Sequence, residues 1–198
     1  STVTGMLGWI MEQVGRDPTI MNGAVMKNFV SPDSPFASAK VGQGDVFVSE
    51  VDESDGSIAL YRRQVAVLLN VSLDHKSMEE LRVLFSQFVL TAGRVAANAD
   101  DEEARLIAAH ASDVVSFGID APDARIGVAR WSEGPNSLAA SVIDRTGGSP
   151  HELRLATPGR HNLSNALAAI AGAVTAGVEV AEAVRALGTF KGLARRFD

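Results

Sequence analysis

The stretch Asp45-Val-Phe-Val-Ser-Glu50-Val-Asp-Glu-Ser-Asp55 places a short apolar segment directly before a dense group of carboxylates. Residues 46–48 indicate a buried β-strand, because three apolar side chains follow one another without a polar break. The acidic side chains that follow this strand are Glu50, Asp52, Glu53 and Asp55. Ligand sites in parallel α/β sheets lie at the carboxyl ends of strands, so this stretch predicts a site for a hard divalent cation. A solvated acidic loop is the alternative that the stretch alone leaves open.

A second apolar strand repeats this design. Val65-Ala-Val-Leu-Leu-Asn70 has almost no polar character, and His75 follows it with Asp74 as a neighbour that could orient the imidazole ring. Because the ends of two strands can meet over one edge of a sheet, Glu50 and His75 form a candidate metal pair. Magnesium is favoured because it prefers oxygen ligands. An ordinary surface or core histidine is the alternative.

The chain around these strands alternates between helical and strand patterns. The predicted helices are residues 2–15, 77–91, 101–110, 163–176 and 180–187, and the other strands before residue 120 are 19–21, 94–98 and 114–118. Ser77 and Glu80 have the spacing of a capping box. This alternation predicts an α/β fold with a mostly parallel sheet flanked by helices on both faces.

Residues 125–157 show a different pattern. Strands are predicted at 126–131, 138–143 and 152–156, and Gly, Pro, Asn and Ser turns separate them without an intervening helix. The pattern predicts a small three-stranded antiparallel subsheet within one domain that spans residues 1–198.

Composition narrows the classes of partner. The chain has 198 residues, 46% of them hydrophobic, a formal net charge of −6 and no cysteine. An acidic chain without clusters of Lys and Arg is not expected to bind nucleic acid. The absence of cysteine excludes disulfides and zinc–thiolate sites and fits a cytoplasmic location. No signal peptide is expected, because the chain starts directly with an amphipathic helix. No membrane span is expected, because the most apolar long stretch, residues 166–180, is too short to cross a bilayer.

The stretch Pro158-Gly-Arg-His-Asn162-Leu-Ser-Asn165 opens a predicted helix with more amide and imidazole groups than capping needs. Asn162 and Asn165 lie one turn apart, so both amides can face one planar group such as an adenine edge. The alternative is that Asn162 only caps the helix and Asn165 is incidental.

Four segments of the chain occur together in an order and spacing that resembles a known family. They are Glu50-Val-Asp-Glu-Ser-Asp55, Asn70-Val-Ser-Leu-Asp-His75, Gly159-Arg-His-Asn162-Leu-Ser-Asn165-Ala and Phe190-Lys-Gly-Leu-Ala-Arg-Arg-Phe-Asp198. Over essentially the whole chain this pattern is similar to the central, ATP-binding domain of the Mur ligases, whose fold is like that of the P-loop NTPases. The acidic run and the closing Arg-Arg-Phe-Asp favour the branch that joins L-alanine to UDP-N-acetylmuramate.

The family's phosphate loop reads Gly-x-x-Gly-Lys followed by Ser or Thr and the first helix, whereas this chain begins at Ser1-Thr2. The resemblance therefore implies a domain cut just after the phosphate-loop lysine, which should not turn over substrate by itself. Such loops cradle phosphates with backbone N–H groups at a helix N-terminus.

The resemblance also implies a role for each matching residue. Ser1, Glu50 and His75 would be magnesium ligands. Ser1, Thr2, His161, Asn162, Asn165 and Arg196 would bind ATP, and Glu50, His75 and Arg196 would serve catalysis. The implied reaction passes through an acyl phosphate, from which the amine of L-alanine displaces phosphate. UDP-N-acetylmuramate, L-alanine and the flanking N- and C-terminal domains are the implied partners of a full-length enzyme.

Two features depart from the family pattern or bear on the branch. Ser77 stands where the family carries an aspartate in Asp-His-x-Asp, and residues 77–91 lack the lysine that some relatives carbamoylate. The L-alanine branch also lacks this lysine. Two alternatives stay open: a ligase that attaches a recycled murein tripeptide, and a nucleotide-binding homologue whose ligase activity has decayed.

Overall fold

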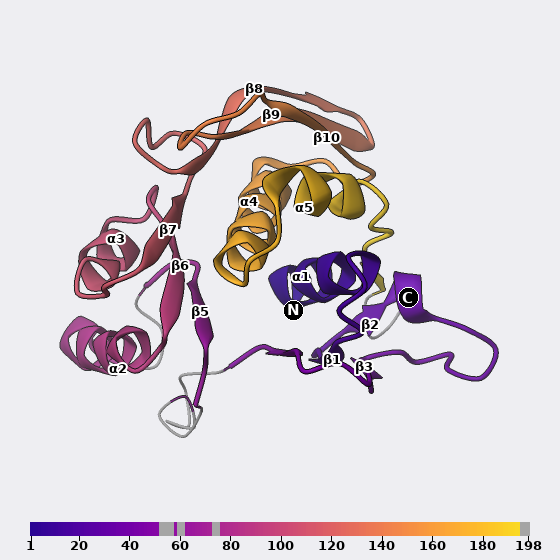
Figure 1. Ribbon diagram of the computed structural model, residues 1–198, viewed down its shortest axis with the longest axis horizontal. Helices are drawn as coiled ribbons and strands as arrows, with labels where there is room; N and C mark the ends of the chain where they lie inside the picture. The colour runs from indigo at the N-terminus through magenta and orange to yellow at the C-terminus, as the bar shows by residue number, and fades with distance from the viewer. Residues whose placement is uncertain (52–57, 59–61, 73–75, 195–198) are drawn as a thin grey trace.

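A computed structural model of the protein describes residues 1–51, 58, 62–72 and 76–194 (Figure 1). The helices are α1 (Thr2–Gln13), α2 (Met78–Leu90), α3 (Glu102–Ala108), α4 (Arg160–Thr175) and α5 (Val180–Leu187), with a short 3-10 helix η1 (Lys27–Phe29). The strands are β1 (Thr19–Met21), β2 (Val25–Met26), β3 (Ala39–Lys40), β4 (Phe47–Ser49), β5 (Val65–Leu68), β6 (Arg94–Asn98), β7 (Val114–Phe117), β8 (Ile126–Gly134), β9 (Ser137–Asp144), β10 (His151–Leu155) and β11 (Leu193–Ala194).

A 6-stranded sheet with the order β10-β9-β8-β7-β6-β5 forms the centre of the fold. Strands β5, β6, β7 and β8 run parallel, and β8, β9 and β10 form the expected antiparallel meander. The meander continues the parallel sheet through the pairing of Phe117 with Ile126. The prediction of an α/β fold with a mostly parallel, helix-flanked sheet and a small antiparallel part is confirmed.

Helices cover both faces of the parallel strands (Figure 1). Helices α2 and α3 lie on one side of β5, β6 and β7, while α4 lies on the other, together with α1 and α5. Side chains of β6 alternate accordingly: Val95 and Ala97 join the core beneath α2 and α3, and Ala96 joins the core around α4. Burial on both faces explains why the parallel strands have so few polar residues.

Among the helices that the structure describes, α4 has the most buried residues, and its small side chains let other elements approach closely. A Cβ atom on Gly172 would lie 3.1 Å from Val67 of β5 and 3.3 Å from Leu7 of α1. The helix begins at Arg160, three residues before the predicted start. Its first turn is polar, so hydrophobic periodicity could not reveal it.

The start of α2 confirms a local prediction. Ser77 is the N-cap and accepts a hydrogen bond from Glu80 N–H, while the Glu80 carboxylate accepts one from Ser77 N–H. The backbone N–H groups of Ser77 and Glu80 are thereby both satisfied by side chains at the start of the helix.

Two expectations for the first apolar strand are wrong. β4 belongs to a separate 3-stranded sheet with the order β3-β1-β4, so it does not share a sheet edge with β5. Only one face of this smaller sheet is buried, and Val48 points into it with 7% exposure. Phe47 points to the other face and is 56% exposed, because side chains alternate along a strand.

No helix in the described part of the chain is long and apolar enough to cross a membrane.

Candidate functional site

Three chain segments far apart in the sequence meet at the N-terminal end of α1. Parallel pairing of β1 with β4 sets Met21 beside Ser49, so the residues that follow both strands leave the sheet together. Gly23 follows β1, Glu50 follows β4, and Ser1 is the N-cap of α1. The sheet register therefore delivers a carboxylate to a helix N-terminus.

Glu50 is the centre of this group. Its Oε2 atom lies 2.6 Å from the Ser1 amino nitrogen, and the side chain is 40% exposed. Burial raises the pKa of Glu50, but hydrogen bonds from the Ser1 amino group, the Ser1 hydroxyl and Gly23 N–H outweigh it and hold this pKa below its usual value. Glu50 is thus an ionised carboxylate at neutral pH.

Gly23 makes this arrangement possible. A Cβ atom at this position would collide with the Glu50 Oε1 atom and would lie 3.1 Å from the Ser1 hydroxyl oxygen. Only a residue without a side chain lets the backbone approach both oxygens. Gly23 therefore shapes the cradle in which the two side chains meet.

Asn22 adds a buried polar group next to the cradle. Its amide nitrogen and oxygen are both buried and have no hydrogen-bond partner among the residues that the structure describes. The nitrogen would lie 3.1 Å from a Cβ atom on Gly5, which places the amide beneath the first turn of α1. Buried polar groups are normally satisfied, so this amide is notable at a candidate site.

The oxygen atoms in this cradle are ligands that fit a hard cation. The Ser1 hydroxyl and the Glu50 carboxylate supply oxygen atoms, which magnesium prefers. Within residues 1–51, 58, 62–72 and 76–194 no group of three His, Asp or Glu side chains could hold a metal ion. His75, Asp52, Glu53 and Asp55 lie outside the described residues, so the expected role of His75 stays a prediction.

The second predicted site is the N-terminal end of α4. His161 is exposed, while Asn162 and Asn165 are half-buried and lie one turn apart on this helix. Gly159 is the N-cap, with a φ of 106°, so Asn162 is not the cap. The Asn162 Nδ2 atom donates to the Pro158 carbonyl oxygen at 2.6 Å. This bond fixes the amide and leaves its oxygen available as an acceptor.

Arg160 ties this helix end to the loop after β7. Its guanidinium forms an ion pair with the Asp120 carboxylate, with Nη2 and Oδ2 2.5 Å apart. Arg196, the predicted phosphate-contacting arginine, lies outside the described residues. Thr2 is the first residue of α1 and is half-buried.

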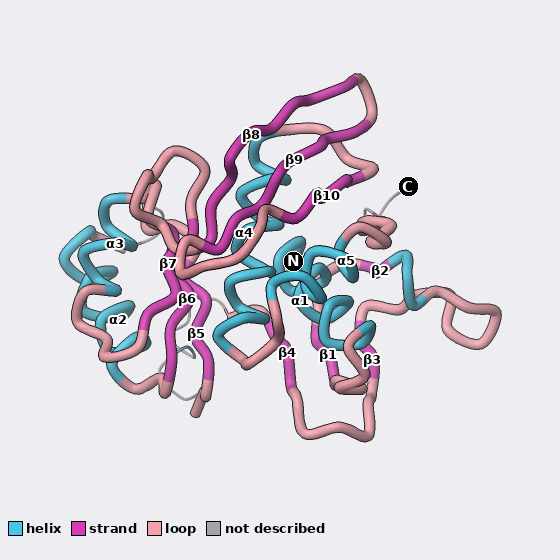
Figure 2. The backbone as a smooth tube through the Cα atoms, turned by 45° about the horizontal axis from the view of Figure 1, so that its top comes forward, coloured by secondary structure: helices cyan, strands magenta, loops and turns pink. Residues whose placement is uncertain are grey.

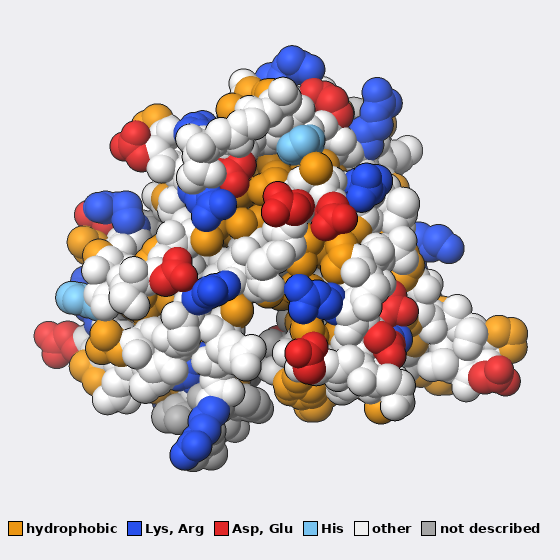
Figure 3. Space-filling view, in the orientation of Figure 1, with side chains coloured by type: hydrophobic (Ala, Val, Ile, Leu, Met, Phe, Trp, Pro, Cys, Tyr) orange, Lys and Arg blue, Asp and Glu red, His pale blue; other side chains and the backbone are white. Residues whose placement is uncertain are grey.

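The surface around these groups carries both signs of charge. Figure 3 shows acidic and basic side chains interspersed over the face seen in Figure 1, without one large single-sign patch. The same view shows the surface hollowed between the part of the molecule that carries β5 and the part that carries α1.

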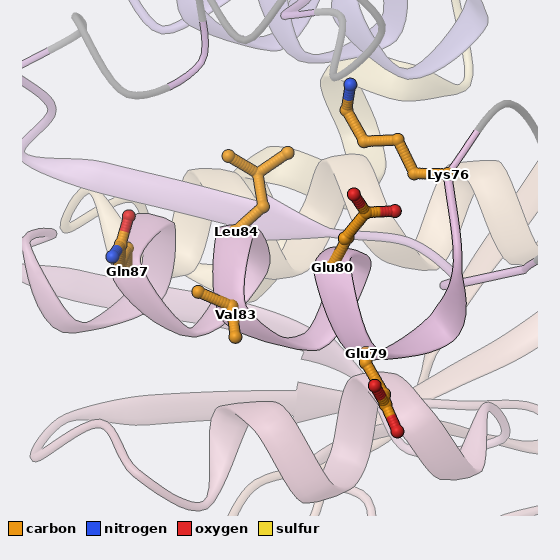
Figure 4. Close-up of a pocket in the computed structure, with 6 residues that line it drawn as sticks. All are labelled: Lys76, Glu79, Glu80, Val83, Leu84 and Gln87. Carbon is orange, nitrogen blue, oxygen red and sulfur yellow. The ribbon is translucent and has the colours of Figure 1, made fainter.

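An open pocket of 420 Å³ lies elsewhere, along α2 (Figure 4). Its lining residues are Lys76, Glu79, Glu80, Val83, Leu84 and Gln87. Glu80 already serves the capping box, and none of the predicted site residues lines this pocket. The pocket is therefore not part of the candidate site.

The mostly parallel 6-stranded sheet and its flanking helices define an α/β domain, and the candidate cation site follows strands β1 and β4 of the smaller sheet. The chain belongs to the Mur ligase middle-domain family, because a family model with that description matches residues 1–173. This membership confirms the resemblance noted from the four ordered segments.

Curated relatives indicate the branch to which the chain is similar. It is 36% identical over 211 residues to the UDP-N-acetylmuramate–L-alanine ligase of Paenarthrobacter aurescens (strain TC1), covering 100% of this chain and 43% of the relative. It is 37% identical over 205 residues to the enzyme of the same name from Clavibacter michiganensis subsp. michiganensis (strain NCPPB 382), covering 100% and 41%. The chain thus spans less than half the length of these relatives.

Solved structures agree on the fold. The UDP-N-acetylmuramate–alanine ligase of Thermotoga maritima superposes with a TM-score of 0.82 at 26% identity, covering 99% of this chain and 44% of that one. A murein peptide ligase from Psychrobacter arcticus superposes with a TM-score of 0.81 at 24% identity, covering 98% and 45%. The two scores are so close that the fold does not separate the two kinds of ligase.

Sequence reasoning assigned no function to Asn22, Gly23 or Asp120. Gly23 had one available signal, since a glycine in the turn that follows a strand often marks a close backbone approach. Asp120 had none, because its partner Arg160 is 40 positions away and only the fold brings them together.

Proposed function

We propose that this chain is the ATP- and magnesium-binding middle domain of a cytoplasmic ligase that joins L-alanine to UDP-N-acetylmuramate in peptidoglycan precursor synthesis. The observation that carries this proposal is the cradle in which Glu50 meets Ser1 beside Gly23 at the start of α1. Family membership and the names of the curated relatives support the reaction class.

The start of α1 suits a phosphate group. The helix has 12 residues, its first turn contains no acidic side chain, and Ser1 makes no side-chain capping bond within the described chain. The first N–H groups of a helix lack intrahelical acceptors and carry partial positive charge, which attracts anions. An ATP phosphate at this position would accept hydrogen bonds from these N–H groups.

Ser1 and Glu50 are the described residues that would hold magnesium, with His75 as a further expected ligand. When bound, magnesium supplies positive charge that offsets the negative charge of the phosphate oxygens. Glu50 contributes by remaining ionised, and Gly23 by leaving room for the Glu50 carboxylate next to the Ser1 hydroxyl.

The N-terminal end of α4 would hold adenine. Asn162 is oriented by its bond to the Pro158 carbonyl, and Asn165 follows on the same helix face. An amide can offer both a donor and an acceptor to the edge of a planar base. His161 is exposed beside them and completes the predicted set with Arg196.

The ligase reaction needs groups that this chain does not supply. UDP-N-acetylmuramate, L-alanine and the flanking domains would belong to the full-length enzyme, as the longer relatives indicate. The substrate carboxylate would attack the γ-phosphate to give an acyl phosphate, and the amine would then displace phosphate. The tripeptide ligase is the weaker candidate, because the curated relatives cited above carry the L-alanine name.

Phosphate release by the full-length protein tests this proposal. We expect ATP-dependent release with UDP-N-acetylmuramate and L-alanine, and a loss of at least about 100-fold in kcat for Glu50→Gln, which removes the charge but keeps the shape. Glu152→Gln is a matched control on the exposed Arg130–Glu152 pair of the meander. Phosphate release only with murein tripeptide would favour the recycling ligase. If none of the amines supported phosphate release, both enzyme assignments would be contradicted.

A further inference from the structure

The loop that follows β7 is held in place by one carboxylate. Asp100, just after β6, accepts hydrogen bonds from three successive backbone N–H groups: Ile119 at 2.6 Å, Asp120 at 3.0 Å and Ala121 at 2.7 Å. A Cβ atom on Gly118 would lie 2.8 Å from Asp100 Oδ1, so this glycine lets the carboxylate approach. Both Asp100 oxygens are therefore used to fix the backbone of residues 119–121.

The side chain of Asp120 projects from this fixed loop to α4. It pairs with Arg160 through two nitrogens, with Nη2–Oδ2 and Nη1–Oδ1 distances of 2.5 Å and 3.4 Å. Arg160 is the first residue of α4 and directly precedes His161 and Asn162. The contact thus runs from the end of β6, through the loop after β7, to the first turn of α4.

The turn after β6 also reaches toward β5. Asp101 is the N-cap of α3, and its Oδ1 atom accepts from Ala104 N–H at 2.8 Å and from Val71 N–H at 3.4 Å. Val71 follows β5 in the segment that leads to His75. Adjacent aspartates therefore contact the backbone that follows two different strands, at the same edge of the sheet.

We propose that Asp100 and Asp120 are positioning residues for nucleotide binding, which act by fixing the first turn of α4 through Arg160. This inference rests on the proposed ATP site, because it concerns the helix end that would face adenine. Neither aspartate needs to touch the nucleotide. Their contribution is to hold the loop and helix end in the binding arrangement before the ligand arrives, which lowers the entropy lost on binding.

The expected size of the effect follows from the exposure of the pair. The side chains of Arg160 and Asp120 are 46% and 74% exposed, so solvent weakens their attraction. An exposed pair of this kind contributes roughly 1 kcal/mol at most, which corresponds to about a fivefold change in Kd. Asp100 should matter more, since its removal leaves three backbone N–H groups without an acceptor.

The test measures ATP affinity and steady-state kinetics in the full-length protein. We expect Asp120→Ala and Arg160→Ala each to raise the Kd and KM for ATP about fivefold, with kcat unchanged. The Kd for ATP of the double variant should be no higher than that of either single variant, because both substitutions remove the same contact. Asp120→Glu should restore most of the affinity, while Glu152→Ala, from the exposed Arg130–Glu152 pair, should change nothing.

Asp100→Ala should raise the Kd for ATP by more than Asp120→Ala does, and its melting temperature shows whether the loop change also affects folding. Wild-type affinity in Asp120→Ala, or fully additive losses in the double variant, would overturn this inference while leaving the ATP site intact. Absence of ATP binding by the wild-type protein would overturn the proposed function and this inference together.

Discussion

Gly23 illustrates how a missing side chain can define a site. Its backbone N–H donates to Glu50, and its lack of a Cβ atom leaves room for the Glu50 carboxylate beside the Ser1 hydroxyl. The backbone of Gly23 does not have a positive φ, so backbone strain is not the reason for glycine here. The requirement is steric and involves only the two oxygens that would bind a cation.

Substituting this glycine should therefore impair binding more than folding. We expect Gly23→Ala to displace Glu50 and to weaken magnesium and ATP binding by about tenfold or more, measured by titration calorimetry. Gly188→Ala is the matched control, because its φ is −59° and its nearest neighbour would lie 3.4 Å away. Unchanged affinity in Gly23→Ala would show that the cradle does not hold the ligand.

Ser77, which departs from the family pattern, has a clear structural role. It stands at the last position of the Asp-His-x-Asp motif expected from the resemblance, and in this protein its hydroxyl accepts from Glu80 N–H as the N-cap of α2. Aspartate is an equally good N-cap. The exchange therefore preserves the start of α2, whatever it changes at His75.

We accordingly expect Ser77→Ala to lower the free energy of unfolding by about 1 kcal/mol, since it removes the cap. Ser77→Asp should retain wild-type stability, because its carboxylate can replace the hydroxyl. Urea unfolding followed by circular dichroism measures both. Wild-type stability in Ser77→Ala would mean that the cap contributes nothing to stability, and a loss in Ser77→Asp as large as in Ser77→Ala would mean that aspartate cannot replace the serine cap.

At the scale of elements, the hairpin of β8 and β9 is fastened at its open end by a charged pair. Arg125 Nη2 lies 3.0 Å from Asp144 Oδ2, and Thr146 N–H donates to the same carboxylate at 2.9 Å. Burial raises the pKa of Asp144, but the hydrogen bonds from Arg125 and Thr146 outweigh it and hold this pKa below its usual value. The carboxylate is therefore more stable as an anion in the folded protein than in the unfolded chain.

The sign of the resulting pH dependence follows from linkage. A depressed folded-state pKa contributes stability that is complete above the unfolded pKa of about 3.9 and is lost as the pH falls through the folded pKa. We expect Asp144→Asn to cost about 1 kcal/mol at pH 7, because Arg125 is 36% exposed and solvent screens the pair. Below about pH 4 the variant and the wild type should converge in melting temperature. A constant difference down to pH 2 would contradict this account.

At the scale of the whole molecule, α4 lies between the 6-stranded sheet and helices α1 and α5 (Figure 1 and Figure 2). It packs against α1, α5 and strands of the 6-stranded sheet, and residues 166–171 are almost completely buried. Small side chains allow these contacts, since interiors are packed without spare volume. The position of the candidate adenine site at the start of α4 therefore depends on the whole core.

A larger side chain in this helix tests how tightly the core around α4 is packed. We expect Ala169→Leu, at a position with no exposed surface, to lower the free energy of unfolding by about 1–3 kcal/mol. Ala181→Leu on the exposed side of α5 is the control and should have little effect. Denaturant unfolding monitored by tryptophan fluorescence measures both variants, and equal stability would indicate a core with unfilled space.

Features that arise between neighbouring residues follow from the sequence alone. The capping box of Ser77 and Glu80, the alternation of strands and helices, and the turns of the meander all depend on local spacing, so they could be predicted. The predicted start of α4 was three residues late, because polar residues open that helix without hydrophobic periodicity.

The tertiary fold sets which distant residues meet. It placed β4 in a sheet separate from β5, turned Phe47 toward solvent, and brought Glu50 to Ser1 across 49 positions of the chain. It also joined Asp100 to the loop after β7 and Asp120 to Arg160. Such contacts depend on strand register and helix packing, which are set by the burial of many side chains at once rather than by any single stretch of sequence.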